Sequence, residues 1–420
     1  MKIRLIEPEP PGMHVYAKVL LPRLGLPIIA ATLKAHGHDV LIYSPQMAPV
    51  DYVARGEGGE QIMLELIETM NGARELDDIG GLSFKRDGAA VHNPLRERLT
   101  DLDELPFPDL RLLVGNEKLT TMPIMTSWGC PFACNFCSVT AMFGRRYRFR
   151  GAESVIAEIK DKRPARIFFY DDNMAADKKR LKKLLRMMID EDLIIPWSAQ
   201  VRTDVVRDRE LLELMQKSGC ELVYLGLESV NQATLDGYEK AQTVDDIVEG
   251  IRLLHEYGIR SHGMFVLGAD TDSVQTVRDT VDFAIKNRID TVMLNILTPL
   301  PGTPQFEDLD AAGRIFDKRW HLYDAHHVVF EPKLMTPYEL QMEDLRGYMR
   351  FYSLRTWLRY IFALKFTKQL LFHWWGMVII HNWRKDERNK AFIKALKRMW
   401  PRPTPPGTVR GVSGGGFRKS

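Results

Sequence analysis

Short apolar segments alternate with longer amphipathic segments through the middle of the chain. The longer segments are typical of helices that bury one side, and the short ones are typical of buried strands. Strand and helix in regular alternation predict a parallel sheet with helical crossovers. The predicted strands lie at 123–127, 166–170, 197–201, 222–226, 262–267 and 291–296, and the predicted helices lie at 152–162, 178–192, 208–218, 244–257 and 273–287.

The length of this region limits the number of strand–helix units. One unit takes about 30 residues, so residues 123–300 hold about six of them. A complete eight-unit barrel needs about 250 residues. We therefore expect an α/β fold built on a partial (βα)6 TIM-like barrel, open along one side.

The flanking regions follow other patterns. Near the N-terminus the sequence predicts strands at 3–6 and 40–43 and helices at 26–36 and 61–71, which is a small, truncated α/β domain. Beyond residue 304 the alternation stops, and helices rich in Trp and Phe are expected. The predicted division is the truncated domain at 1–100, a linker at 101–122, the barrel at 123–330, a helical region at 331–400 and a disordered tail at 401–420.

Composition and charge narrow the class of protein. With 420 residues, 45% of them hydrophobic and 27% charged, the chain is globular rather than fibrous or wholly disordered. The net charge of +3 is divided unevenly, because residues 355–420 hold 15 Lys or Arg against Asp386 and Glu387, a balance of +13 that leaves −10 for residues 1–354. Such a basic segment is attracted to anionic surfaces. No RNA-binding module accompanies it, so nucleic acid is not an expected partner.

The basic, aromatic helices allow two interpretations. They pack on the open side of the barrel, which we favour, or they lie on a membrane with Trp and Phe inserted. The 15 residues between Lys368 and Arg384 are shorter than the ~20 that a spanning helix needs. The N-terminus shows no apolar segment typical of a secretory signal. A cytoplasmic location follows, with peripheral contact to the inner membrane face as a second hypothesis.

Three cysteines cluster directly after the first predicted barrel strand. Cys130, Cys134 and Cys137 are separated by three and two residues, at the end of a strand where barrel active sites lie. Thiolates in such a loop bind an iron–sulfur cluster or zinc. A structural zinc needs a fourth ligand, but no His follows within the next hundred residues, and Cys220 fits the buried start of a later strand. A zinc knuckle or three reduced cysteines remain as alternatives.

This loop, with Phe136 before its third cysteine, resembles the signature of the radical S-adenosylmethionine (SAM) superfamily. The resemblance implies that Cys130, Cys134 and Cys137 hold a [4Fe-4S] cluster whose open iron binds SAM. It also implies a reductant of the flavodoxin or ferredoxin type. One-electron cleavage of SAM would give methionine and a 5′-deoxyadenosyl radical, which abstracts hydrogen from the substrate.

Polar residues at later strand ends agree with this resemblance. In similar proteins, carboxylates after the second strand hold the amino group of SAM, which implies this role for Asp171 and Asp172. Arg202 after the third strand is a partner for the methionyl carboxylate or for a neighbouring acidic residue. Glu228 after the fourth strand supplies a polar contact, and the turn at Gly268 is expected to face the adenine.

Two N-terminal fragments resemble opposite ends of the cobalamin-binding domain that is often fused to these barrels. Residues 23–40 resemble its beginning and residues 51–58 its end, but only seven residues separate Tyr43 from Asp51. The sequence therefore leaves cobalamin binding open and does not predict a complete site. A second cluster is excluded because only Cys220 is left. His326 and His327 follow the barrel and are interpreted as satisfied surface histidines.

The resulting hypothesis is a radical SAM enzyme with one cluster that modifies an unreactive carbon of a small-molecule or lipid substrate. Methyl transfer, cyclisation and carbon–carbon coupling all remain open. One alternative is a cobalamin-dependent radical SAM methyltransferase. Another is a non-catalytic iron–sulfur or zinc-binding protein that keeps the fold.

Overall fold

Six strands form the central sheet, and their order in the sheet is the same as their order in the chain. In the computed structural model the order is β6-β9-β10-β11-β12-β13, and the three pairs from β10 to β13 are parallel. The structure describes residues 2–6, 25–43, 52–97, 100–240, 242–362 and 368–401. The predicted α/β fold with a six-stranded partial barrel is confirmed. The strands are β6 (Met122–Ile124), β9 (Ile167–Phe169), β10 (Trp197–Val201), β11 (Cys220–Glu228), β12 (Arg260–Leu267) and β13 (Thr291–Ile296).

The helices between these strands begin at side chains that cap them. Asp177, Asp208, Thr243 and Ser273 each accept a hydrogen bond from a backbone N–H of the first turn, which would otherwise have no partner. The predicted helices are confirmed within two residues at each end. They are α4 (Ala152–Lys162), α5 (Lys178–Asp190), α6 (Arg209–Lys217), α8 (Val244–Glu256) and α9 (Val274–Lys286), and two shorter ones, α3 (Ser138–Phe143) and α7 (Gln232–Gly237), join them.

The two faces of the sheet differ in burial. On β10 to β13, alternate residues are completely or almost completely buried and form the main core. The residues between them keep partial access to solvent, except Gly226, Glu228, Val266 and Met293, which are buried. Trp197, the largest fully buried side chain, meets Phe169 edge to face with ring centroids 5.4 Å apart. One face of this sheet is therefore a packed core, and the other is open. The core residues include Ala199, Val201, Val223, Leu225, Phe265, Val292, Leu294 and Ile296.

The chain divides into two compact units, each described by itself. The first contains the described residues up to Trp128 and Arg148–Phe168, and the second contains Gly129–Tyr147 and the described residues from Phe169 onward. In the first unit, β1 (Lys2–Ile6) and β2 (Asp39–Tyr43) lie where strands were predicted, and they pair in parallel. This unit also contains β6, α4 and the first two residues of β9. Among its other elements are α1 (Gly25–Ala35), α2 (Gly59–Met70), the antiparallel sheet of β3 (Tyr52–Ala54), β4 (Leu82–Arg86) and β5 (Ala89–His92), and the pair β7 (Ser127–Trp128) and β8 (Arg148–Phe149).

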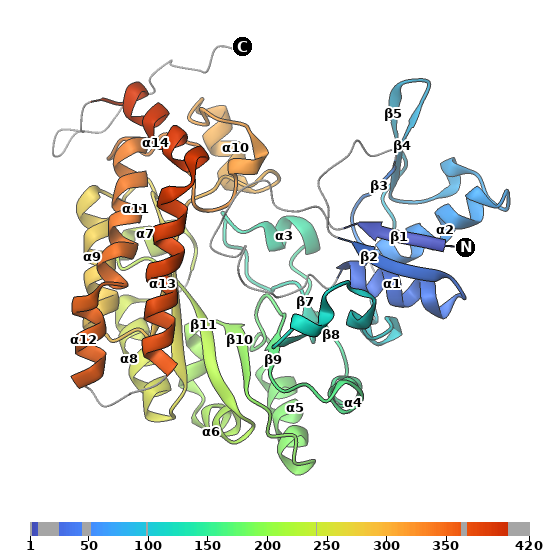
Figure 1. Ribbon diagram of the computed structural model, residues 1–420, viewed down its shortest axis with the longest axis horizontal. Coiled ribbons are helices and arrows are strands. Elements are labelled where there is room, and N and C mark those ends of the chain that lie inside the picture. The colour runs from blue at the N-terminus through green and yellow to red at the C-terminus, as the bar shows by residue number, and fades with distance from the viewer. Residues whose placement is uncertain are drawn as a thin grey trace. The chain divides into compact units, whose positions relative to one another are not determined.

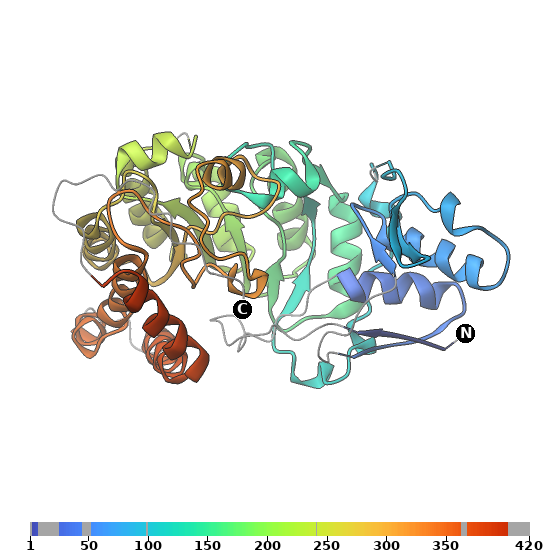
Figure 2. The same cartoon turned by 90° about the horizontal axis from the view of Figure 1, so that it is seen from above.

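The predicted C-terminal helical region is present. It contains α11 (Pro337–Phe351), α12 (Leu354–Phe362), α13 (Lys368–Lys385) and α14 (Glu387–Met399), and α10 (Pro304–Ala311) precedes it within the range predicted for the barrel. Helices α11 to α14 contact one another, and both views show them grouped beside the sheet of the second unit (Figures 1 and 2). Among the described residues, no helix is both long and apolar enough to span a membrane. Residues 402–420, most of the predicted disordered tail, lie outside the described residues.

Helix α11 closes the edge of the sheet through two tyrosines. The hydroxyl of Tyr348 accepts from the N–H of Leu294 at 2.8 Å and donates to the carbonyl of the same residue at 3.0 Å. Tyr352 makes the same pair of bonds with Val292, at 3.0 and 2.9 Å. The outward backbone groups of these two β13 residues are therefore satisfied by side chains, as an uncovered edge requires. This contact agrees with packing of the C-terminal helices on the open side of the barrel.

Candidate functional site

The loop of three cysteines is fixed at its first residue and at its end. Gly129 has φ +84°, and a Cβ at this position would overlap the backbone carbonyl oxygen of Arg146. Its N–H donates to Oδ2 of Asp172 at 3.2 Å. At the other end the N–H of Cys137 donates to the carbonyl of Cys134 at 3.1 Å, and α3 follows directly. Glycine is needed here because both the left-handed backbone and the close approach exclude a side chain.

The three thiols of this loop lie near enough to influence one another. Desolvation is the largest cause that raises the pKa of Cys130, and the same cause raises the pKa of Cys137 to about 11. Negative charge on Cys134 raises both values further. Cys130 and Cys137 are therefore protonated at neutral pH unless a cation compensates their thiolates. Binding of iron would supply that charge and release protons, as metal binding to thiols does.

The side chains after β9 lie beside the cysteine loop. Asp172 bonds to Gly129, and although the residue as a whole is exposed, desolvation of its carboxyl group and the charge of Asp171 raise its pKa. Asp171 is buried, and its carbonyl accepts from the side chain of Gln200 at 3.3 Å. Asn173, which the sequence did not single out, hydrogen-bonds to the Cys130 sulfur and lowers the pKa of that thiol. The sequence signal that could have identified Asn173 is its position directly after the two aspartates.

Arg202 connects the cysteine loop to Lys240, three residues beyond the end of α7. Its guanidinium lies 3.8 Å from the ring centroid of Phe132, and its Nη2 donates to the carbonyl of Lys240 at 2.5 Å. The positive charge of Arg202 also lowers the pKa of Cys130. Its buried Nε has no hydrogen-bond partner among the described residues, although it lies 3.9 Å from Oδ1 of Asp204. One donor of Arg202 therefore remains for an anionic or polar ligand beside the loop.

Glu228 forms a buried ion pair that the sequence did not indicate. Its Oε1 lies 2.6 Å from Nζ of Lys240, and both side chains are less than one tenth exposed. The backbone of Glu228 has φ +60°, and the β11–β12 register shifts between Gly226 and Glu228. A Cβ on Gly226 would come within 2.7 Å of the Glu228 carboxylate and 2.8 Å of the Lys240 ammonium. Gly226 thus leaves room for this pair at the end of the strand, and the strained backbone is of the kind found at functional sites.

Gly268 lies in a turn whose described contacts do not reach the cysteine loop. Its N–H donates to Oδ2 of Asp272 at 3.0 Å. With φ +101°, a Cβ at this position would lie 2.6 Å from Leu340 and 3.2 Å from Phe330. Glycine is therefore explained here by close packing and backbone conformation, and contact of this turn with adenine stays a prediction.

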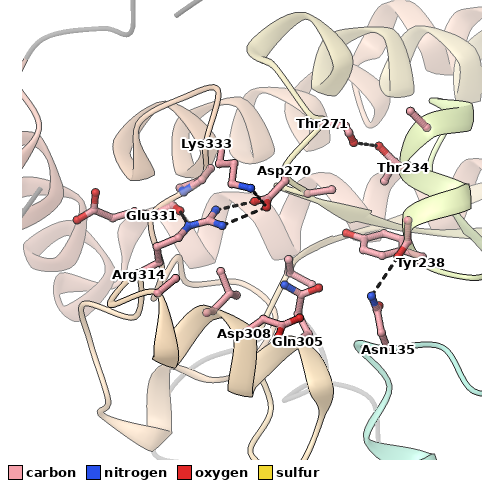
Figure 3. A pocket seen from close by; sticks show the side chains of 17 residues that line it. Asn135, Thr234, Tyr238, Asp270, Thr271, Gln305, Asp308, Arg314, Glu331 and Lys333 are labelled. Atoms are coloured by element: carbon pink, nitrogen blue, oxygen red, sulfur yellow. Dashed lines mark hydrogen bonds and ion pairs between the residues drawn. The ribbon is translucent and has the colours of Figure 1, made fainter. Parts of the chain in front are cut away.

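A cavity of about 600 Å³ opens beside the loop (Figure 3). Asn135, between the second and third cysteines, lines it and donates to the carbonyl of Gly237 at 3.0 Å. Tyr238 directly follows Gly237 and lies beside Asn135, and its buried hydroxyl has no hydrogen-bond partner among the described residues. Asp270 lies 2.6 Å from Arg314 and 2.7 Å from Lys333 on the opposite wall. The cavity therefore combines a charged wall with an aromatic one.

Comparison with known proteins shows which family this chain belongs to. The family model described as Radical SAM superfamily matches residues 124–284. An uncharacterized methyltransferase of Pyrococcus horikoshii is 32% identical over 311 residues, which are 72% of this chain and 67% of that protein. The chain belongs to the radical SAM superfamily. The anaerobic magnesium-protoporphyrin IX monomethyl ester cyclase of Rubrivivax gelatinosus is 30% identical over 346 residues, 78% of this chain and 61% of the cyclase. The chain thus spans about two thirds of the length of these relatives.

A solved structure shows the same fold. The radical SAM methyltransferase TsrM from Kitasatospora setae, with cobalamin and a [4Fe-4S] cluster bound, superposes with a TM-score of 0.59. The match covers 76% of this chain and 80% of TsrM at 16% identity, which supports the fold alone. The predicted membership of the radical SAM superfamily is confirmed, and so is the prediction that this radical SAM protein is an enzyme.

The cofactors of this radical SAM enzyme are a [4Fe-4S] cluster and SAM, and the donor set of the loop fits the cluster. Three thiols share one short segment, and Cys220 is buried in β11 apart from them. Within the described ranges, no three His, Cys, Asp or Glu side chains are gathered around a single metal-ion position. A four-iron cluster does not require this, because each thiolate would bind a different iron. The middle of the cobalamin-like region, residues 44–51, lies outside the described residues.

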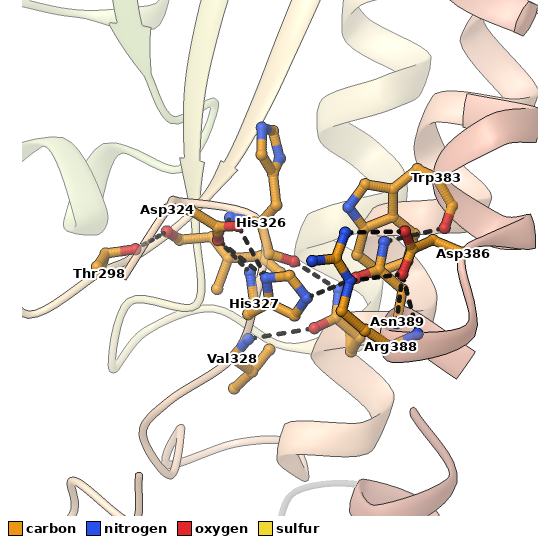
Figure 4. A network of polar contacts seen from close by, with 11 residues as sticks. Thr298, Asp324, His326, His327, Val328, Trp383, Asp386, Arg388 and Asn389 are labelled. Atoms are coloured by element: carbon orange, nitrogen blue, oxygen red, sulfur yellow. Dashed lines mark hydrogen bonds and ion pairs between the residues drawn. The ribbon is translucent and has the colours of Figure 1, made fainter. Parts of the chain in front are cut away.

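The interpretation of His326 and His327 as surface residues is wrong. They are 3% and 5% exposed. Nδ1 of His327 lies 2.9 Å from Oδ2 of Asp324, and its Nε2 lies 3.1 Å from Oδ1 of Asn389 on α14 (Figure 4). The ring of Phe392, also on α14, meets the His327 ring edge to face. The C-terminal helices cover this segment, which the sequence pattern of the segment itself does not reveal.

Proposed function

We propose that this radical SAM enzyme uses Cys130, Cys134 and Cys137 as cluster ligands and modifies an unreactive carbon of an apolar small molecule. Held by these three residues, the cluster would supply the one electron that converts SAM to methionine and a 5′-deoxyadenosyl radical, and this radical would take a hydrogen atom from the substrate. A flavodoxin- or ferredoxin-type protein would supply the electron. The observation that carries the proposal is the loop of three mutually interacting thiols, with polar side chains from three strand ends around it.

Each polar residue would have a separate task at this site. Asn173 orients the Cys130 sulfur by its hydrogen bond. Arg202 would offer the carboxylate of SAM its Nε, which makes no hydrogen bond and lies 3.9 Å from Asp204, while the Phe132 ring and the Lys240 carbonyl hold its guanidinium in place. Asp171 and Asp172 would receive the amino group of SAM. Glu228 acts through Lys240, because its carboxylate is already paired.

Release of 5′-deoxyadenosine tests this proposal directly. The protein is reconstituted anaerobically with iron and sulfide, then given SAM and dithionite, and the nucleoside is measured by mass spectrometry. Cys134→Ala should lose both iron and nucleoside, whereas the matched variant Cys220→Ala should keep both, since Cys220 is buried apart from the loop. Equal cluster content in both variants would contradict the ligand assignment. A full cluster without nucleoside would favour a non-catalytic iron–sulfur protein.

Methyl transfer and cyclisation are the reaction classes that the relatives support. The Pyrococcus relative is named as a methyltransferase and the Rubrivivax relative as a cyclase of a magnesium porphyrin. Magnesium-protoporphyrin IX monomethyl ester is therefore the first substrate to assay, with SAM carrying a trideuterated methyl group. A product heavier by that methyl group indicates methyl transfer, and a product with a new ring and no label indicates cyclisation. An unchanged porphyrin would direct the search to other apolar substrates, including lipids.

Cobalamin-dependent methyl transfer is the alternative mechanism. TsrM supports it as a relative in fold that holds cobalamin. The experiment is reconstitution with hydroxocobalamin, followed by desalting and an absorbance spectrum. Retained corrin in the protein would support the alternative, and complete loss during desalting would oppose it.

Peripheral membrane contact is favoured by exposed aromatic residues on α13. Trp374 and Trp375 are 53% and 50% exposed, and Leu354 on the neighbouring helix α12 is 62% exposed. The charge of +13 over residues 355–420 suits an anionic bilayer. Trp374→Ser/Trp375→Ser should reduce flotation with vesicles that contain anionic lipid. Trp320→Ser, at an exposed position outside these helices, is the matched control, and failure of the wild-type protein to float would refute the contact.

A further inference from the structure

A row of four side chains crosses the open face of the sheet. The residue pairs Gln200–Tyr224, Tyr224–His262 and His262–Thr291 lie directly opposite each other on β10 to β13. All four are only partly buried, whereas their chain neighbours on the other face form the core. With three strand spacings of about 4.8 Å, the row is about 14 Å long. A flat ligand can therefore lie across several strands at once.

The β10 end of this row lies next to the candidate cluster site. Gly226 follows Tyr224 by two positions on β11, so these two residues share a face of the sheet, and Arg202 comes directly after β10, two residues beyond Gln200. Gly226 carries the Glu228–Lys240 ion pair above it, and Arg202 contacts the cysteine loop. Two residues along a strand correspond to about 6.6 Å. His262 itself lies five residues before the end of β12, so it is the β10 end of a ligand spanning the row that would lie one step below Arg202 and the loop it contacts.

His262 is held rigidly by its neighbours in the row. Its Nδ1 lies 2.7 Å from the hydroxyl of Thr291, and its ring centroid lies 4.8 Å from that of Tyr224. Among the described residues, its second nitrogen, Nε2, has no hydrogen-bond partner. Desolvation lowers the pKa of His262 to about 4, so the ring is neutral at physiological pH. A histidine anchored through one nitrogen, with a lone pair on the other, has the arrangement of a metal ligand.

We propose that Nε2 of His262 is the axial ligand of a metallated tetrapyrrole bound across this row. This inference rests on the proposed function and specifies its substrate class. A tetrapyrrole brings four nitrogen ligands to its metal, so one protein ligand completes the site, and no cluster of three is needed. On binding, the Nε2 lone pair forms a bond to the metal and a water ligand leaves, with no change in charge or oxidation state. Tyr224 and Met264 provide apolar surface for the macrocycle.

Titration with zinc protoporphyrin IX tests the ligand role of His262. We expect a red-shifted Soret band with the wild-type holoenzyme and no such shift with His262→Phe, together with at least about tenfold weaker binding. Thr291→Val should weaken binding less, because it removes only the anchor of Nδ1. His321→Gln is the matched control, since His321 is exposed and lies outside the sheet. Metal-free protoporphyrin IX should bind wild type and His262→Phe within about twofold of each other, because it cannot accept the Nε2 bond.

Two results would overturn the inference. One is an identical Soret shift with His262→Phe, and the other is equal loss of the zinc and metal-free porphyrins in that variant, which would indicate a damaged fold or a steric role. Release of 5′-deoxyadenosine without porphyrin separates this inference from the proposed function. If the wild-type protein releases the nucleoside but shows no Soret shift, only the ligand assignment fails. If it shows the shift but releases no nucleoside, the proposed function fails instead.

Discussion

Replacement of Gly129 by alanine should prevent the cysteine loop from holding a cluster. The substitution has two costs, because the residue has φ +84° and because the new Cβ would overlap the carbonyl oxygen of Arg146. The left-handed backbone costs an alanine about 1–2 kcal/mol. The overlap adds about 1–3 kcal/mol, as is typical of overpacking against atoms that cannot move away. Gly258→Ala is the matched control, since Gly258 has φ +71° with nothing within 4 Å of its Cβ position.

Both variants place alanine in a left-handed backbone, so the difference in iron content between them isolates the effect of the overlap. An extra cost of about 1–3 kcal/mol makes the native loop roughly 5- to 150-fold less populated relative to displaced conformations. Iron and sulfide per chain after anaerobic reconstitution, and absorbance near the cluster bands, measure the outcome. Gly258→Ala should match wild type in iron content and lose only a little thermal stability. Equal iron content in Gly129→Ala and Gly258→Ala would refute the reasoning that this close approach positions the thiols.

Three further predictions concern the SAM contact, the sheet edge and a buried carboxyl group. Arg202→Lys should raise the apparent KM for SAM in the 5′-deoxyadenosine assay about tenfold, because lysine lacks the planar group that stacks on Phe132; an unchanged KM would remove Arg202 from the SAM site. Tyr352→Phe should lower the free energy of unfolding by about 1–3 kcal/mol, measured in urea, because the backbone groups of Val292 lose both partners. Asp272 has a pKa raised to about 6 by desolvation, so the folded state binds its proton more tightly than the unfolded state. The contribution of Asp272 to the free energy of unfolding should therefore fall as the pH rises from about 4 to about 6. Asp272→Asn should lack this pH dependence of the free energy of unfolding.

The central sheet could be predicted from the sequence because its strands are short apolar runs between amphipathic helices. All six predicted strands overlap observed ones, and the capped helices between them end within two residues of expectation. The hairpin of β4 and β5 was missed, although its turn carries a signal. Asp87 and Gly88 both have positive φ, 51° and 80°, as a tight two-residue hairpin turn requires, and Asp-Gly is a preferred sequence for it.

The sequence predicts only those parts of the candidate site whose residues lie close together in the chain. The thiols share one loop, and their spacing is visible in the chain. Lys240 could not be assigned to Glu228 because the pairing depends on the bulge at Gly226 and on the path of the chain after α7. His262 lies inside a strand with no motif, and its position beside Tyr224 follows from the strand register alone. Contacts across strands require the register, which single-strand patterns do not contain.

The two tyrosines of α11 also determine how the sheet can grow. An edge strand normally offers its free N–H and C=O groups to a further strand from another chain. At Val292 and Leu294 those groups are taken by the hydroxyls of Tyr352 and Tyr348. A peptide or a second molecule that sought to add a strand there would first have to displace a whole helix. Assembly through backbone pairing at this edge is thereby discouraged, and a chain lacking α11 would be prone to aggregate along β13.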